Sequence, residues 1–288
     1  MTNLDTSDQS KPTQAGGDSS PATTRIALRV EYNGAKFSGW QKQKSPSLAT
    51  VQGALEVALS KVADSTIVVI CAGRTDSGVH ATSQIVHFDT PIDRGVKAWE
   101  LGVNSLLPPT IRVTKALVVD DKFHARFSAV YRRYNYILHT RSIASALVAD
   151  LVTTQRRNLD VDAMNSGAKF LLGEHDFSSF RAAGCQSKTA NRCIIEASFS
   201  EYGEFLVFSI CANAFLQHMV RNIMGSMLAV GSSDKSPEWI ESLLAAKDRT
   251  QAAITAPPQG LYLVEVGYPE NILSPARFVK PPVLASHN

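Results

Sequence analysis

The side chains most able to do chemistry lie in one glycine-framed loop, GRTDSGVHA at 73–81. Asp76 is its only carboxylate, and Arg74 stands two positions before it. The loop follows the apolar run 66–72, and rigid scaffolds commonly present reactive groups on such loops. A nearby guanidinium favours an ionised carboxylate, which acts as a nucleophile or base rather than as an acid. The alternative is a tight turn in which Asp76 caps its own backbone, as Asp beside Gly often does.

Two other chemistries suggested by this loop do not fit the rest of the sequence. Asp76-Ser77-Gly78 matches the triplet of aspartic proteases, whose mechanism needs two carboxylates that share one proton. A second such triplet is absent, and a site built by dimerisation suits a much shorter chain. His80 and His87 lack the helical i, i+4 spacing of metal ligands, and no third ligand is near. There is also no Walker-type loop and no dinucleotide-binding fingerprint, so no cofactor is expected.

Basic residues gather in two stretches that contain no acid, 122–149 and 177–195. The chain carries a net charge of +3, of which the first 24 residues contribute −2, so the remainder carries +3 − (−2) = +5. Aromatic residues accompany the basic ones in both stretches, which favours a polyanionic partner; a solvated surface is the alternative. The basic residues are Lys122, Arg126, Arg132, Arg133, Arg141, Arg181, Lys188 and Arg192.

The elements that must position these groups follow from hydrophobic periodicity and from cap and stop signals. Strands are expected at 25–32, 66–72, 84–88, 111–120, 131–139, 193–202, 205–211 and 261–266. Helices are expected from Thr50, at 96–107, at 160–173, at 214–230 and after Ser236-Pro237. Two halves of mixed strands and helices without strict βαβ alternation predict the α+β class with a mixed, mostly antiparallel sheet.

Composition and the chain ends narrow the class of protein further. With 288 residues, 44 % apolar and 19 % charged, the chain is not a disordered, collagen-like or disulfide-dense secreted protein. Residues 1–24 are expected to form a disordered extension, since they have neither the basic start nor the apolar run of a signal peptide. The four cysteines form no CxxC pair, which favours buried free thiols in a reducing cytoplasm.

The sequence resembles the bacterial tRNA pseudouridine synthase A family over roughly residues 25–268. CAGRTDSGVHA, at 71–81, is similar to the active-site motif of that family, and Ser77 stands where the family often has Ala. Further blocks resemble the family in the same order: VEYNGAKFSGWQKQ, TVQGALEVAL, LGVNSLLP, DDKFHARFSA, YRRYNYIL, FLLGEHDFSSFRA, NAFLQHMVRNIMGS, LLAAKDR and GLYLVEVGYP.

The resemblance implies an isomerase that converts uridine to pseudouridine at positions 38 to 40 of the anticodon stem–loop of tRNA. It places the catalytic aspartate at Asp76 and the active-site tyrosine at Tyr134, where the ring could stack on an extruded uracil and the hydroxyl could assist loss of the C5 proton. It matches Arg221 to the basic residue that pairs with the aspartate. An arginine in an otherwise apolar helix independently needs a partner, unless its head reaches solvent. Arg74 is expected to help open the stem.

The resemblance also implies an architecture and partners. It predicts two related α+β halves, 25–120 and 121–268, around an RNA cleft, followed by a tail at 269–288. It implies a cytoplasmic homodimer that binds tRNA and needs no cofactor or metal. Candidate phosphate contacts are Arg126, Arg132, Arg133, Arg181, Lys188 and Arg192. The rival hypothesis is a non-catalytic RNA-binding or RNA-folding protein that uses the same basic surface.

Overall fold

The computed structural model describes residues 23–43, 48–269 and 279–284. The expected extension at 1–24 therefore lies almost entirely outside the described residues, and the expected tail at 269–288 is described only at 269 and 279–284. The strands are β1 (Thr24–Tyr32), β2 (Ile70–Cys71), β3 (His80–Thr90), β4 (Ile111–Val119), β5 (Tyr131–Thr140), β6 (Thr153–Gln155), β7 (Gly173–Asp176), β8 (Asn191–Tyr202), β9 (Phe205–Ala212) and β10 (Leu261–Gly267). The helices are α1 (Val51–Ala63), α2 (Val103–Leu106), α3 (Val161–Lys169), α4 (Met219–Gly231) and α5 (Trp239–Ala246), with single turns at 98–102, 178–180, 249–251 and 282–284.

All of these strands belong to one sheet in the order β4-β1-β3-β10-β5-β9-β8-β7, with β2 paired to β3 and β6 paired to β5. Neighbours along the main path run antiparallel, except that β10 runs parallel to β3. Strands and helices are thus mixed without βαβ alternation, and the predicted α+β class with a mostly antiparallel sheet is confirmed.

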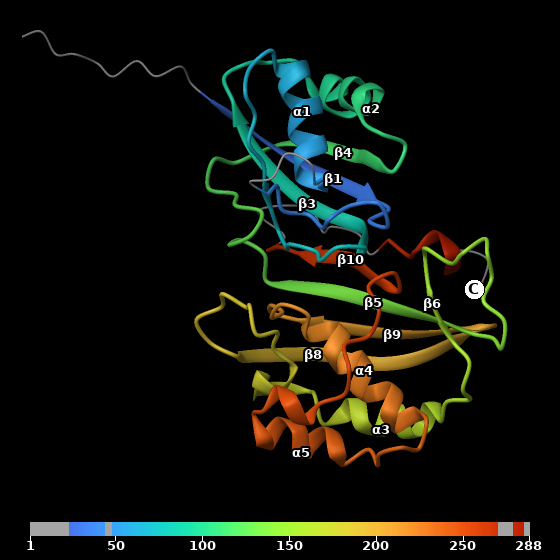
Figure 1. Ribbon diagram of the computed structural model, residues 1–288. Helices are drawn as coiled ribbons and strands as arrows, with labels where there is room; N and C mark the ends of the chain where they lie inside the picture. The colour runs from blue at the N-terminus through green and yellow to red at the C-terminus, as the bar shows by residue number, and fades with distance from the viewer. Residues whose placement is uncertain (1–22, 44–47, 270–278, 285–288) are drawn as a thin grey trace, which may run out of the picture.

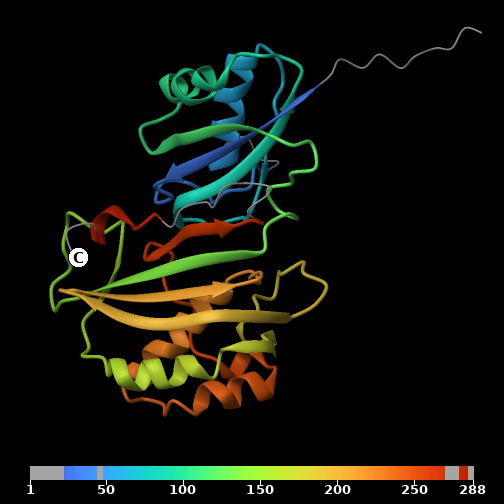
Figure 2. The ribbon, with the colours of Figure 1, turned by 180° about the vertical axis from the view of Figure 1, so that it is seen from behind.

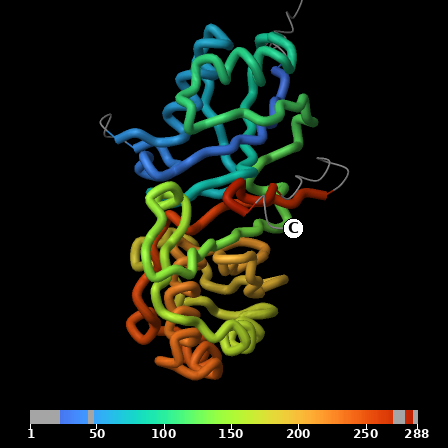
Figure 3. Tube along the Cα trace, turned by 90° about the vertical axis from the view of Figure 1, so that its right-hand side faces the viewer, coloured from blue at the N-terminus to red at the C-terminus, as the bar shows by residue number. Residues whose placement is uncertain are grey.

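Strand β10 joins the two parts of the sheet. It pairs with β3 through Tyr262↔His80 and Leu263↔Ala81, and with β5 through Leu263↔Tyr134. In the side view of Figure 3 the early part of the chain (blue to green) is stacked on the later part (yellow to orange), and the red strand lies between them. The last strand in the sequence is therefore central in space. The division of the chain near residue 120 stays a prediction.

Helices α1 and α4 cover the same face of the sheet, since both lie before the strands in Figure 1 and behind them in Figure 2. The main apolar core fills the space between this face and the helices. A smaller cluster on the opposite face includes Ile137 of β5, Val207 of β9 and Val264 of β10. Because alternate residues of a strand face opposite sides, Tyr134 of β5 points to the helix side and Ile137 to the other.

Of the two elements that precede the loop at 73–79, the start of the helix was predicted correctly and the strand was not. The prediction for Thr50 is confirmed: its hydroxyl caps α1 by accepting from Gly53 N. The strand expected at 66–72 is wrong for most of its length, because only Ile70–Cys71 pairs with β3. Two upstream backbone donors are instead taken by side chains of α1, Ile67 N by Ser60 Oγ at 2.9 Å and Val69 N by Glu56 Oε1 at 3.2 Å.

Four helices have bounds that differ from those expected. The helix expected at 214–230 begins only at Met219, because His218 has a left-handed backbone (φ 60°) that cannot continue a helix. The helix expected at 160–173 ends at Lys169. Hydrogen bonds between residues three apart, such as that from Phe170 N to Gly167 O, tighten its last turn into a 3-10 turn. Gly173 instead opens β7. The helix expected at 96–107 is a π-turn at 98–102 followed by α2, and the short helix after Pro237 begins at Trp239.

The cysteines are all free, and Cys71 and Cys211 are buried as expected, whereas Cys185 and Cys193 are partly exposed. No helix within the described part of the chain is both long and apolar enough to cross a membrane.

Candidate active site

The loop at 73–79 leaves β2 and enters β3, and its backbone is fixed from several sides. Thr75 O accepts from Trp40 N at 3.0 Å, and the Thr75 hydroxyl contacts Tyr32 Oη at 2.8 Å. Gln84 Nε2 donates to Gly73 O at 2.5 Å. The Asp76 side chain accepts no hydrogen bond from the backbone of this loop among the described residues. The self-capping alternative for Asp76 is therefore not what the structure has.

Close approach of a second loop requires glycine. Gly39 has φ +89°, in the left-handed region that side chains rarely adopt, and a Cβ there would lie 2.9 Å from Thr75 O. The loop that carries Gly39 can therefore lie directly against the Asp76 loop and hold it in place.

The Asp76 carboxylate faces Arg221 from α4 and His218, the residue that directly precedes this helix. Arg221 Nη1 lies 3.3 Å and His218 Nε2 lies 3.5 Å from the same oxygen, Asp76 Oδ2. The other oxygen, Oδ1, makes no polar contact with a described residue. The side chain of Asp76 is 25 % exposed, against 13 % for Arg221. One carboxylate oxygen is thus held, and the other is available to a substrate.

The position of α4 depends on backbone contacts with the segment before β10. Arg221 Nε donates to Ala256 O at 2.8 Å, and Ala256 N donates to Arg221 O at 3.1 Å. A Cβ at Gly225 would lie 1.9 Å from Ile254 O, so only glycine allows this segment to pack against the helix. The contact with Ala256 thus fixes the orientation of the Arg221 guanidinium independently of Asp76.

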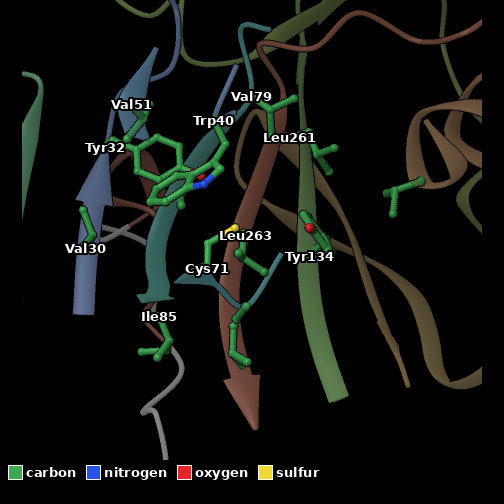
Figure 4. Packing of buried hydrophobic residues seen from close by; sticks show 14 of the residues in the cluster. Val30, Tyr32, Trp40, Val51, Cys71, Val79, Ile85, Tyr134, Leu261 and Leu263 are labelled. Atoms are coloured by element: carbon green, nitrogen blue, oxygen red, sulfur yellow. The ribbon is translucent and has the colours of Figure 1, made fainter. Parts of the chain in front are cut away.

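Tyr134 lies beside the same loop. An added Cβ at Gly73 would lie 3.6 Å from Tyr134 Oη, and the Tyr134 ring meets Phe215 edge to face at 5.1 Å between centroids. Figure 4 shows Tyr134 reaching from β5 into the cluster that contains Cys71 and Leu263. Burial, and next the charge of Asp76, raise the pKa of Tyr134. Its phenol is therefore neutral at physiological pH and is a hydrogen-bond donor rather than a base.

The sheet register explains how residues so distant in sequence meet. Ala81 of β3, Leu263 of β10 and Tyr134 of β5 form one row across three strands. Adjacent strands are about 4.8 Å apart, so Tyr134 is about 10 Å across the sheet from Ala81, which follows Asp76 by five positions. The site needs β10 in place, since this strand sets that spacing.

Several arginines expected to contact phosphate are engaged by the protein itself. Arg132 is 9 % exposed, and four of its N–H groups donate to the carbonyls of Ala129, Asn213, Ala72 and Arg126. Arg132 therefore fastens neighbouring segments together rather than presenting a charge to RNA.

Two further arginines are also committed. Arg192 is 9 % exposed and donates to Thr189 O, Asn191 O and Ser187 Oγ. Arg133 points to the face of the sheet opposite Tyr134, where it pairs with Glu196 and Glu265. Neither guanidinium is brought to Asp76.

The remaining basic candidates are more accessible. Arg74, Arg126 and Lys188 are exposed, and none of the three side chains forms an ion pair or hydrogen bond with a described residue. Arg181 is partly exposed and donates to the carbonyls of Cys185 and Ser187.

Sequence reasoning missed two parts of the site. His218 gave no periodic signal, because it lies outside α4; the signal that could have indicated it is its place three residues before Arg221. The 254–258 segment has no motif at all. Within the described ranges, no group of three His, Cys, Asp or Glu side chains could hold a metal ion.

Comparisons with known proteins identify the family of the chain. The family described as tRNA pseudouridine synthase matches residues 28–128 and 168–269. The chain is 50 % identical over 261 residues to tRNA pseudouridine synthase A of Pseudoalteromonas atlantica, covering 91 % of this chain and 98 % of that protein. It is 52 % identical over 244 residues to the protein of the same name from Francisella tularensis subsp. tularensis, covering 84 % and 93 %.

A solved structure of a Cbf5-Nop10-Gar1 complex matches with a TM-score of 0.32 and 10 % identity, over 83 % of this chain and 58 % of that one, which carries no argument. The sequence matches do, because they include the Asp76 loop, Tyr134 and the start of α4 and extend over nearly the whole length of the relatives. The chain therefore belongs to the tRNA pseudouridine synthase family.

Proposed function

We propose that this protein isomerises uridine to pseudouridine in tRNA, at positions 38, 39 and 40 of the anticodon stem–loop, with Asp76 as the reactive carboxylate. The single observation that carries the proposal is the arrangement around Asp76: Oδ2 is held by Arg221 and His218, while Oδ1 is open. Family membership supports the reaction and the tRNA substrate.

The reaction rearranges one nucleotide without redox change. The N1–C1′ bond breaks, the uracil turns, a C5–C1′ bond forms, C5 loses a proton and N1 gains one. The guanidinium of Arg221 lies 3.3 Å from Oδ2 and holds the carboxylate in position. Whether the carboxylate adds to the sugar or removes a sugar proton, it must act as an anion close to C1′, and Oδ1 is the oxygen free to do so.

Tyr134 has a binding rather than a basic role in this proposal. Its neutral hydroxyl makes no hydrogen bond with a described residue, and its ring stands beside the Asp76 loop. A flipped nucleotide needs both a surface on which to stack and a donor for its polar edge. Tyr134 offers both to the uracil, whereas removal of the C5 proton requires another base.

The accessible basic side chains would guide the RNA. Arg74 precedes Asp76 by two positions and is exposed, as expected of a residue that enters the stem beside the flipped nucleotide. We propose Arg126 and Lys188 as phosphate contacts, with Arg181 in part. Arg132 and Arg192 instead are buried and hold neighbouring segments of the chain in place through hydrogen bonds.

The proposal includes a homodimer that works in the cytoplasm, where tRNA is found, and it requires no cofactor. Analytical ultracentrifugation with and without tRNA measures the stoichiometry directly.

The decisive experiment is Asp76→Asn, with Asp93→Asn as a matched exposed control. Asp76→Asn keeps the shape of the side chain but removes its charge, so we expect loss of pseudouridine formation on an unmodified tRNA transcript, with tRNA affinity changed by only a few-fold. Asp93→Asn should behave as the wild type. Isomerisation retained by Asp76→Asn would exclude the catalytic assignment of Asp76, whereas a wild-type protein that binds tRNA and forms no pseudouridine would favour the non-catalytic RNA-binding hypothesis. Pseudouridine mapping in a strain that lacks the protein then identifies the positions.

A further inference from the structure

The turn between β4 and β5 displays an aromatic ring to solvent. Phe127 is 75 % exposed and is the only aromatic residue among the exposed large apolar side chains of the described residues. Exposed Arg126 precedes it, with its guanidinium carbon 5.5 Å from the ring centroid. Single exposed apolar residues are common, so exposure alone indicates nothing. What distinguishes Phe127 is how firmly it is held.

His124 organises this turn. Its Nδ1 accepts from Arg126 N at 3.2 Å and from Phe127 N at 3.1 Å, and its ring stacks on one face of Phe127 at 4.3 Å between centroids. Ser128 closes the turn: its hydroxyl accepts from His124 N at 3.0 Å, and its backbone N–H donates to His124 O at 2.9 Å. Burial, and next the charge of Arg25, lower the pKa of His124, which keeps the accepting nitrogen unprotonated. The Phe127 ring is thus pre-organised while exposed.

The same turn is tied to the catalytic loop. Nη2 of Arg132 donates to Ala72 O at 3.1 Å and to Arg126 O at 2.6 Å, so one guanidinium group bridges the start of the Asp76 loop and the turn. Ala125 is fixed in turn by His87 Nδ1 and by the Tyr268 hydroxyl. The charges of Arg74 and Arg126 both act on the thiol of Cys71. The guanidinium groups of both exposed arginines are therefore near the same buried residue.

We infer that Phe127 and Arg126 form a stacking platform for an unpaired nucleobase of the RNA, beside the nucleotide that enters the active site. An aromatic face binds any base, and an adjacent guanidinium adds stacking or contacts the phosphate of the same nucleotide. Base flipping leaves neighbouring bases without a stacking partner, and a rigid ring near the active site offsets that loss. The inference rests on the proposed function for the identity of the RNA, but it concerns binding and not isomerisation.

The test uses the full-length protein and an unmodified anticodon stem–loop RNA with uridines at 38 to 40. We expect Phe127→Ala to raise the Kd of this RNA about 5- to 100-fold, the range for loss of one base–aromatic stack. Phe127→Trp should remain within about threefold of wild type, and Phe127→Leu, which keeps an apolar side chain but no aromatic face, should resemble Phe127→Ala. Leu147→Ala, which truncates a side chain that is 92 % exposed, is the matched control and should leave the Kd unchanged.

Three results would overturn the platform: an unchanged Kd in Phe127→Ala, wild-type affinity in Phe127→Leu, or a change of oligomeric state in Phe127→Ala, which would place the ring in an interface between copies of the chain. The melting temperature of Phe127→Ala should equal that of wild type, because the side chain is mostly in solvent. If the wild-type protein forms no pseudouridine but the Kd still depends on an aromatic residue at 127, the proposed function fails and the platform stands.

Discussion

His218 Nε2 and Asp76 Oδ2 are 3.5 Å apart, and the backbone of His218 is left-handed, with φ 60° and ψ 4°. Such a backbone is uncommon for residues other than glycine and costs on the order of 1 kcal/mol. The fold accepts this strain at the one position that brings an imidazole to the carboxylate.

Replacing His218 by glycine separates function from stability. Glycine relieves the strain and removes the imidazole, so we expect His218→Gly to be as stable as wild type or more stable by up to about 1 kcal/mol, and at least 10-fold slower in single-turnover isomerisation. His218→Gln, which keeps an N–H donor on a longer side chain, should recover part of the rate. A variant that lost stability and kept its rate would show that His218 serves only the helix start.

Arg221 should be intolerant even of lysine. Its guanidinium contacts Asp76 through Nη1 and Ala256 O through Nε at once, and a single ammonium cannot make both contacts. We expect Arg221→Lys to lower kcat at least 10-fold with KM within threefold, because the contact orients the carboxylate and not the RNA. Steady-state kinetics on a tRNA transcript measures the split. A rise in KM with unchanged kcat would instead make Arg221 an RNA contact.

Substitution of Arg132 should reduce stability, whereas substitution of Arg126 should reduce RNA binding. Arg132→Gln leaves several buried carbonyls without donors, so the free energy of unfolding should fall by about 2–4 kcal/mol. Arg126→Gln should leave the melting temperature unchanged and reduce the slope of log K against log salt by about 1, as expected for loss of one phosphate contact. Denaturant titration and RNA binding at several salt concentrations compare the two. Equal salt slopes in Arg126→Gln and wild type would contradict the phosphate assignment.

Acid should weaken the fold through His80. This residue directly follows the Asp76 loop, accepts from Gly34 N and contacts Gln259 O, and burial lowers its pKa to about 4. Below pH 6.5 the unfolded chain binds a proton at this histidine and the folded protein does not, so stability is full above pH 6.5 and declines as pH falls toward 4. The loss from His80 is on the order of 3 kcal/mol at pH 4. His80→Gln should show a shallower decline in urea titrations between pH 7 and 4; a slope equal to that of wild type would assign the loss to other groups.

Much of the site could be predicted from local sequence, and the remainder depends on tertiary register. The loop around Asp76 was evident from its glycines and its place after an apolar run, and a charged Arg221 in an apolar helix indicated an ion-pair partner. His218 was missed because nothing local predicts a left-handed histidine at a helix start. Arg132, Arg133 and Arg192 all lie in basic stretches without acidic residues, and the sequence does not distinguish them. In the structure, Arg132 and Arg192 donate to neighbouring oxygens of the protein, whereas Arg133 points to the other face of the sheet and pairs with Glu196. Runs of basic residues in the sequence show where cationic side chains occur, but not which of them form hydrogen bonds or ion pairs within the protein.

The place of β10 in the sheet has a consequence for synthesis. Contacts of the Asp76 loop region with the segment leading into β10 span 179 residues, as between His80 and Gln259. Contacts of such long range form late, since a large loop must close before they contribute. A nascent chain can build β1, β3 and β4 early, but it cannot align Asp76 with Tyr134 until residues 261–267 have left the ribosome. The geometry for catalysis thus arises only after β10 has been synthesised and has entered between β3 and β5.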